Sequence, residues 1–88
     1  MITAVVLITA ERGALPKLGE ELAAIPGVSE VYSVTGEFDF IAMVRAKAHD
    51  DLAEIVTGRI AQTRGVARTH THVAFRAYSK HDLETLFG

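Results

Sequence analysis

The chain of 88 residues is long enough for one domain with a modest core, and its apolar content of 49% excludes a disordered polypeptide. Nine basic and eleven acidic residues give a formal net charge of −2, which argues against direct nucleic acid binding. The lack of cysteine excludes disulfides, thiolate metal sites and thiol nucleophiles. No targeting or membrane-spanning segment is visible, so we expect a cytoplasmic protein with no membrane partner.

The first predicted element is a strand over Ile2–Thr9, which is apolar and β-branched on both alternating faces. Such a strand is typical of the centre of a sheet. A helix should follow, with Gly13 as its cap and Pro16 in its first turn, and it should end at Pro26-Gly27. Its apolar positions recur at helical spacing and predict a buried stripe of Leu15, Leu18, Leu22 and Ile25.

A hairpin is predicted next. Val28–Thr35 alternates between polar and apolar residues, as an edge strand does, whereas Phe38–Ala46 is apolar on both faces, as a central strand is. Between them, Gly36-Glu37 suits a two-residue type II′ turn, because that turn needs φ > 0 at its first central position.

The second half of the chain repeats this order. Asp50 can cap a second helix, whose buried stripe would be Leu52, Ile55, Val56 and Ile60. Val66–Phe75 alternates and predicts a second edge strand. The tail from Arg76 predicts a short C-terminal helix.

An internal repeat supports this reading. At an offset of 38, six residues of the first half match six of the second: Ala4, Val6, Leu18, Leu22, Gly27 and Val28 onto Ala42, Val44, Val56, Ile60, Gly65 and Val66. Two βαβ units predict an α+β, ferredoxin-like βαββαβ fold with a four-stranded antiparallel sheet, as one domain over 1–88 (core 2–75, tail 76–88). Right-handed crossovers place both helices on one face. The apolar second face then needs a cover, and another copy of the chain is the simplest one.

Three segments together resemble a known family: Ile25-Pro26-Gly27-Val28, the Val34-Thr35-Gly36-Glu37-Phe38-Asp39 hairpin, and Gly65-Val66 followed by Thr69-x-Thr71. Over Ile2 to Phe75 the chain resembles the RAM domain (regulation of amino acid metabolism), the effector-binding part of Lrp/AsnC transcriptional regulators. Family members usually carry an N-terminal helix-turn-helix domain. Here Met1 leads into the first strand, so we expect a stand-alone module without its own DNA-binding domain.

The resemblance implies a small-molecule sensor. It implies homodimers of the dimeric α/β barrel type, formed through the sheet faces, and higher oligomers of dimers. It also implies an amino acid effector between dimers, no cofactor, and association with full-length Lrp/AsnC-type regulators. The residues that it assigns to the ligand are Gly36, Glu37, Phe38 and Asp39 in the hairpin, and Thr69 and Thr71 on the last strand.

Each of these residues also has a plainer interpretation. Asp39 can satisfy turn amides, and the two threonines can simply be strand formers. His70 and His72 share one strand face, but no nearby carboxylate completes a metal site, so we expect exposed edge positions and no metal. Arg68 and Arg76 read as ordinary surface charge.

No catalytic constellation appears in the sequence, so we expect no enzyme. Two alternatives share the fold: a small dimeric α/β-barrel enzyme of monooxygenase or isomerase type, and an ACT-like regulatory domain.

Overall fold

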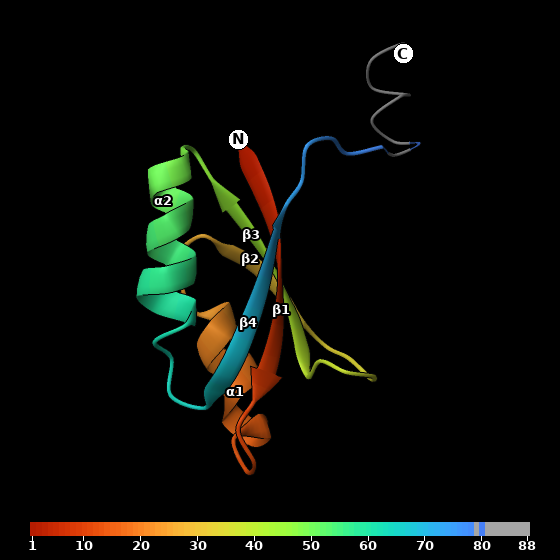
Figure 1. The fold of residues 1–88 in the computed structure, drawn as a ribbon, viewed down its shortest axis with the longest axis vertical. Coiled ribbons are helices and arrows are strands. Elements are labelled where there is room, and N and C mark those ends of the chain that lie inside the picture. Colours follow the sequence, from red (N-terminus) through yellow and green to blue (C-terminus); the bar gives the residue numbers. More distant parts are fainter. Residues whose placement is uncertain (79, 81–88) are drawn as a thin grey trace.

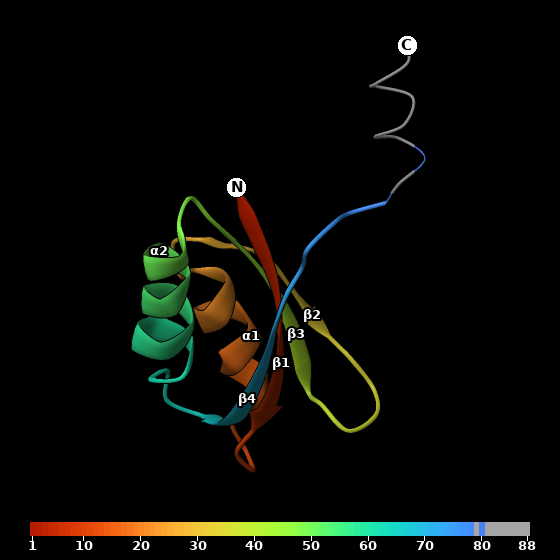
Figure 2. The same cartoon turned by 45° about the horizontal axis from the view of Figure 1, so that its top comes forward.

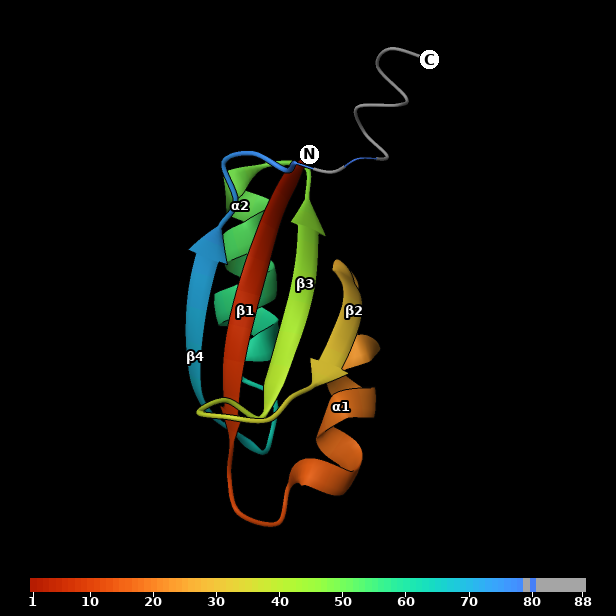
Figure 3. The same ribbon diagram turned by 90° about the vertical axis from the view of Figure 1, so that its right-hand side faces the viewer.

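The computed structural model describes residues 1–78 and 80 and has the predicted ferredoxin-like architecture. The elements in chain order are β1 (Ile2–Ala10), α1 (Leu15–Ala23), β2 (Val28–Ser33), β3 (Phe40–Ala46), α2 (His49–Ala53) with its π-helical continuation η1 (Glu54–Ile60), and β4 (Val66–Val73). The antiparallel sheet has the order β2-β3-β1-β4, so the predicted central and edge strands are confirmed. Both helices cover one face (Figure 1), and the other face is open (Figure 3).

The core lies between the sheet and the helices. Alternate residues of the two central strands point into it, and the other set of side chains faces the open side of the sheet. Helix α1 contributes Leu18 and Leu22, which are fully buried. The complete set of buried apolar residues is Ala4, Val6, Ile8, Leu18, Leu22, Phe40, Ala42, Val44, Ala46, Leu52 and Ile60.

The ends of the helices differ from the prediction. Helix α1 begins at Leu15 with Ala14 as its N-cap, so Gly13 lies outside it, and Leu15 is 50% exposed rather than buried. Asp50 does not cap α2: Ala48, in an extended conformation, is the N-cap, and Asp50 lies in the first turn. There its carboxylate suits the positive end of the helix dipole.

The β2–β3 connection is longer than predicted. Ser33 pairs with Phe40, so residues 34–39 form a six-residue loop and the predicted two-residue turn is wrong. Gly36 does adopt a positive φ of 106°, at the tip of that loop. Strand β4 ends at Val73 instead of Phe75. The predicted C-terminal helix falls mainly on residues outside the described part of the chain.

Two glycines of the internal repeat occupy equivalent turns. In the first, the N–H of Val28 donates to the carbonyl of Ile25 at 3.0 Å; in the second, the N–H of Val66 donates to the carbonyl of Thr63 at 3.1 Å. Gly27 and Gly65 have φ values of 97° and 102°, which the third position of a type II turn requires.

Each of these turns packs against the other half of the chain. A Cβ atom on Gly27 would collide with the side chain of Ile55, and one on Gly65 would lie 2.8 Å from the Cβ of Ala14. Both positions therefore need glycine for space as well as for backbone conformation.

Within the described residues, no helix combines the length and the apolar character needed to cross a bilayer.

Candidate functional site

The β2–β3 loop folds across one end of the open sheet face (Figure 3). Asp39 ties it down with three hydrogen bonds. The N–H of Val34 donates to the Asp39 carbonyl at 3.0 Å, and the N–H of Asp39 donates to the Ile8 carbonyl at 2.9 Å. The third bond runs from the N–H of Ala10 to Asp39 Oδ2 at 2.7 Å, where the pairing of β1 with β4 becomes irregular. The loop is therefore anchored to the central strand as well as to its own hairpin.

The open face has an apolar centre between two polar edges. Val5 and Leu7 of β1 pair with Met43 and Ile41 of β3, and all four side chains are only half-buried. Strand β2 adds Glu30 and Tyr32 at one edge, and β4 adds Arg68, His70 and His72 at the other. This pattern is typical of a surface that another protein surface covers.

A hollow lies between the loop and β4. Its volume is about 450 Å³, and it is lined by Thr9, Glu37, Phe38, Arg68 and His70. The rings of Phe38 and His70 meet edge to face, with centroids 5.4 Å apart and an interplanar angle of 70°. A carboxylate and a guanidinium therefore flank a small aromatic wall. Such a set of groups can bind a zwitterion that carries an apolar side chain.

A second hollow lies on the other side of Phe38. It measures about 590 Å³ and is lined by Ser33, Val34, Thr35, Glu37, Phe38 and Ile41. Glu37 and Phe38 line both hollows, so these two loop residues lie at the centre of the site.

The structure brings together only part of the predicted site. Glu37 and Phe38 line the hollows, Gly36 forms the exposed loop tip, and the Asp39 carboxylate faces Ala10. Thr69 and Thr71 pair with Ile8 and Val6, two residues that point into the core.

The two threonines therefore lie on the helix side of β4, away from the hollows of their own chain. The residues of β4 that do line a hollow are Arg68 and His70, which sequence reasoning treated as ordinary surface residues. Their alternation with Thr69 and Thr71 shows that the two pairs lie on opposite faces of the strand, but it does not show which face carries the hollow.

Glu30 and Tyr32 form a hydrogen-bonded pair at the β2 edge of the open face. The Tyr32 hydroxyl donates to Glu30 Oε2 at 2.6 Å. This bond raises the pKa of Tyr32 above its ordinary value of 10.0, and desolvation and the negative charge of Glu30 act in the same direction. The Glu30 carboxylate is thereby oriented along the sheet edge.

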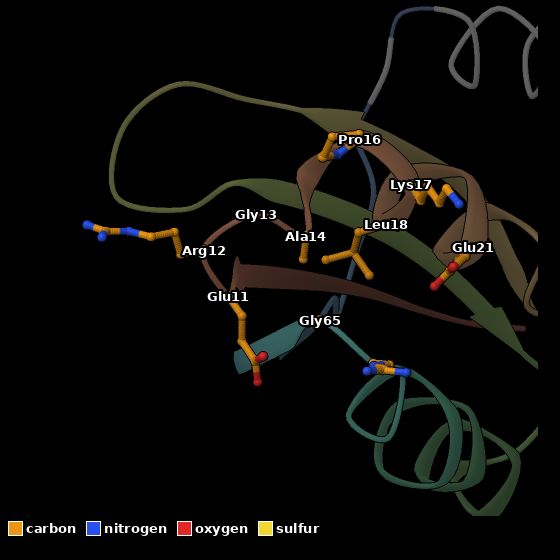
Figure 4. Close-up of a pocket in the computed structure, with 10 residues that line it drawn as sticks. Glu11, Arg12, Gly13, Ala14, Pro16, Lys17, Leu18, Glu21 and Gly65 are labelled. Carbon is orange, nitrogen blue, oxygen red and sulfur yellow. The ribbon is translucent and has the colours of Figure 1, made fainter.

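Two other regions were considered as ligand or metal sites and are weaker candidates. A hollow of about 550 Å³ lies beside the β1–α1 connection and Gly65, but the side chains of Glu11, Arg12 and Lys17 diverge around it (Figure 4). In residues 1–78 and 80, no group of three His, Cys, Asp or Glu side chains could hold a metal ion. The hollows beside Phe38 are therefore the better candidates for a ligand site.

The sequence and the fold both have relatives among known proteins. Residues 3–83 match the family model described as the Lrp/AsnC ligand binding domain. An HTH-type transcriptional regulator of Pyrococcus horikoshii is 41% identical over 59 residues, which are 67% of this chain and 39% of that protein. The chain thus spans well under two thirds of the length of this curated relative.

Two solved structures are also similar. TTHA0845 from Thermus thermophilus is 49% identical, with a TM-score of 0.84 over 91% of this chain and 100% of that one. The feast or famine regulatory protein of Mycobacterium tuberculosis, solved in complex with L-methionine, is 30% identical, with a TM-score of 0.74 over 91% of this chain and 54% of that one. This chain belongs to the family of Lrp/AsnC ligand-binding domains.

Proposed function

We propose that this chain is an amino acid sensing module, and that the effector binds in the hollow between the loop and β4, which Phe38 and His70 line. The observation that carries the proposal is that Glu37 and Arg68 line the same hollow as the Phe38 and His70 rings. A free amino acid carries one ammonium and one carboxylate group, and both need partners when water is removed. Glu37 accepts hydrogen bonds from the ammonium group, and Arg68 donates to the carboxylate. Each charge-assisted bond contributes about 1.5–3 kcal/mol.

The remaining residues of the predicted site have supporting roles in this proposal. Asp39 holds the loop against β1, and Gly36 lets the loop turn at its tip. Thr69 and Thr71 face away from the hollow of their own chain, so they would contact the effector of a neighbouring subunit in a larger assembly. The relative from Mycobacterium tuberculosis, solved with L-methionine, supports an amino acid as the ligand.

Assembly is the second part of the proposed function. The half-buried centre of the open face, made of Val5, Leu7, Ile41 and Met43, packs against the same face of a second copy. An isologous dimer of this kind hides the apolar surface of both copies with one contact. Dimers then associate further, and effector binding shifts that association.

The module acts on transcription through partners. We infer that it associates with full-length Lrp/AsnC-type regulators in the cytoplasm, where free amino acids are available, and that it catalyses no reaction. With a net charge of −2, the chain alone should not bind DNA. A gel-shift titration at moderate salt should show no complex, and tight sequence-dependent binding would contradict this part of the proposal.

A thermal-shift screen of the twenty amino acids tests the binding site. A ligand that binds only the folded protein raises the melting temperature by mass action. The substitution Arg68→Met should weaken the best ligand about ten- to a hundredfold, because it removes the carboxylate partner. Arg12→Met is the matched control, since Arg12 is exposed at the β1–α1 connection. Equal losses in both variants, or none in either, would exclude the hollow beside Phe38.

A further inference from the structure

The side chains of the open face form two rows that cross the sheet. Both helices lie on the other side of the sheet (Figures 1 and 2), so these rows are on the surface of the single chain. Each row begins with a polar group of β2, continues through one apolar residue of β3 and one of β1, and ends with an imidazole of β4. In that order, the rows are Glu30, Met43, Val5 and His72, and Tyr32, Ile41, Leu7 and His70.

Glu30 and His72 lie too far apart to meet within one chain. Three strand spacings separate β2 from β4, which is about 14 Å. The Glu30 carboxylate accepts a hydrogen bond from the hydroxyl of Tyr32, which is neutral at physiological pH because its pKa is raised. His72 lies beside Val5 of β1, with His70 two residues away on the same strand face. A carboxylate at one edge and an imidazole at the other therefore need a second surface to bring them opposite charges.

The other charged residues near this face are balanced or lie at its ends. Arg68 lines the hollow at the loop end together with Glu37, so their opposite charges lie near each other within one chain. The Asp39 carboxylate is bound to the backbone of β1. Arg45 lies at the other end of the face, where it is exposed and donates a hydrogen bond to a threonine of β1. In the middle of the face, the groups left for a partner are Glu30 and the imidazoles of β4.

The two rows are self-complementary. In the open-face dimer, a two-fold axis parallel to the strands places β2 of one copy opposite β4 of the other. Glu30 then faces His72 of the partner subunit, and Tyr32 faces the partner's His70. Facing sheets pack about 10 Å apart, a gap that two long side chains at facing positions can close. An axis across the strands would instead set the two acidic edges against each other. Opposite charges therefore favour the parallel axis.

We propose that ion pairs between Glu30 of each copy and His72 of its partner make dimerisation depend on pH. This inference rests on the proposed function, because it uses the open-face dimer. An imidazole changes its charge between pH 5 and 8, whereas a carboxylate keeps its charge over most of that range. A facing carboxylate favours the protonated imidazole, so the dimer takes up protons as it forms. The ion pairs are therefore present at pH 6 and are lost as the pH rises toward 8.

His70 is the other imidazole of this edge, and it should act differently. Its ring meets Phe38 edge to face in its own chain, and across the dimer it faces the partner's Tyr32, which is neutral. Protonation of His70 therefore gains no ion pair and places a like charge beside His72. We expect His70→Gln to keep or enlarge the pH dependence of the dimer, whereas His72→Gln should remove it.

Sedimentation equilibrium at pH 6 and pH 8, at equal ionic strength, tests the proposal. We expect the dissociation constant of the dimer to be about three- to thirtyfold lower at pH 6, as two exposed ion pairs allow. His49→Gln is the matched control for His72→Gln, because His49 is exposed at the start of α2, and it should keep the difference. Equal dissociation constants at both pH values, or a difference that survives His72→Gln, would overturn the proposed ion pair.

Exchange of the two charges gives a second test. Glu30→Lys and His72→Glu should each weaken the dimer about tenfold or more, because each places like charges opposite one another. The double variant should restore the dimer and show no pH dependence between pH 6 and 8, since lysine and glutamate both keep their charges there. A double variant no tighter than either single variant would overturn the pairing of these two positions. A chain that is monomeric at both pH values would instead overturn the assembly part of the proposed function.

Discussion

The carboxylate of Asp39 accepts a hydrogen bond of 2.7 Å from the backbone N–H of Ala10, and this bond joins the β2–β3 loop to the end of β1. If the carboxylate were removed, the N–H of Ala10 would lose its partner. Because this hydrogen bond is partly buried, water would not fully replace it.

We therefore expect Asp39→Ala to lower the free energy of unfolding by about 1–3 kcal/mol, as loss of one partner of a buried hydrogen bond does. Asp39→Asn keeps an acceptor oxygen and should cost less. Urea unfolding of both variants measures the difference. If Asp39→Ala instead lost amino acid binding at unchanged stability, the carboxylate would contact the ligand directly.

Gly27 and Gly36 both have positive φ values, yet alanine should be tolerated differently at the two positions. An added Cβ at Gly36 meets nothing within 4 Å, so Gly36→Ala should cost only the backbone strain, about 1 kcal/mol. At Gly27 the same strain is joined by a collision with Ile55, and we expect a loss of about 2–4 kcal/mol. Thermal or urea unfolding compares the two. Similar losses would mean that Ile55 moves aside freely.

A charge at the centre of the open face should separate the proposed dimer. Leu7 is half-buried in the single chain and lies beside Ile41, so Leu7→Glu would place a carboxylate in the proposed apolar interface. Light scattering at micromolar concentration should report a monomer that keeps its secondary structure. Leu15→Glu, at an exposed position on α1, should leave the dimer intact. A dimer that survives Leu7→Glu would place the interface elsewhere.

Tyr32 should titrate above its ordinary pKa of 10.0 because its hydroxyl donates to Glu30. The raised pKa means that this bond favours the folded chain below pH 10 and that the benefit is lost as the pH rises through the raised pKa. Glu30→Leu removes both the acceptor and the charge and should bring the Tyr32 pKa back toward 10.0, which ultraviolet or NMR titration can follow. No change in that variant would assign the shift to desolvation alone.

The arrangement of the strands could be predicted because hydropathy reports it directly. β1 and β3 are apolar on both faces and occupy the centre, whereas β2 and β4 alternate and form the edges. The length of the β2–β3 loop could not be predicted in this way. Asp39 bonds to Ile8 and Ala10, and these contacts between segments far apart in the sequence take Phe38 out of β3. The sequence of the π-helix η1 also has no hydropathy pattern that distinguishes it from an α-helix, so its helix type could not be predicted.

The sequence pointed to the loop of the candidate site but not to its edge-strand residues. Glu37 and Phe38 were assigned to the candidate site through the resemblance of the hairpin to the family's loop, and both line the hollows. On β4 both faces are polar, so composition does not show which of Arg68, Thr69, His70 and Thr71 faces the loop. Only the pairing of β1 with β4, in which Leu7 lies opposite His70, assigns the faces.

The turns at Gly27 and Gly65 carry a consequence for how the fold is held together. Each turn belongs to one half of the internal repeat and packs against the other half, Gly27 on Ile55 and Gly65 on Ala14. The contacts are reciprocal, because each half supplies one turn and packs against the turn of the other.

Neither half can close its own core. A chain cleaved beside Gly36 would keep both turn contacts, so its two fragments should reassemble.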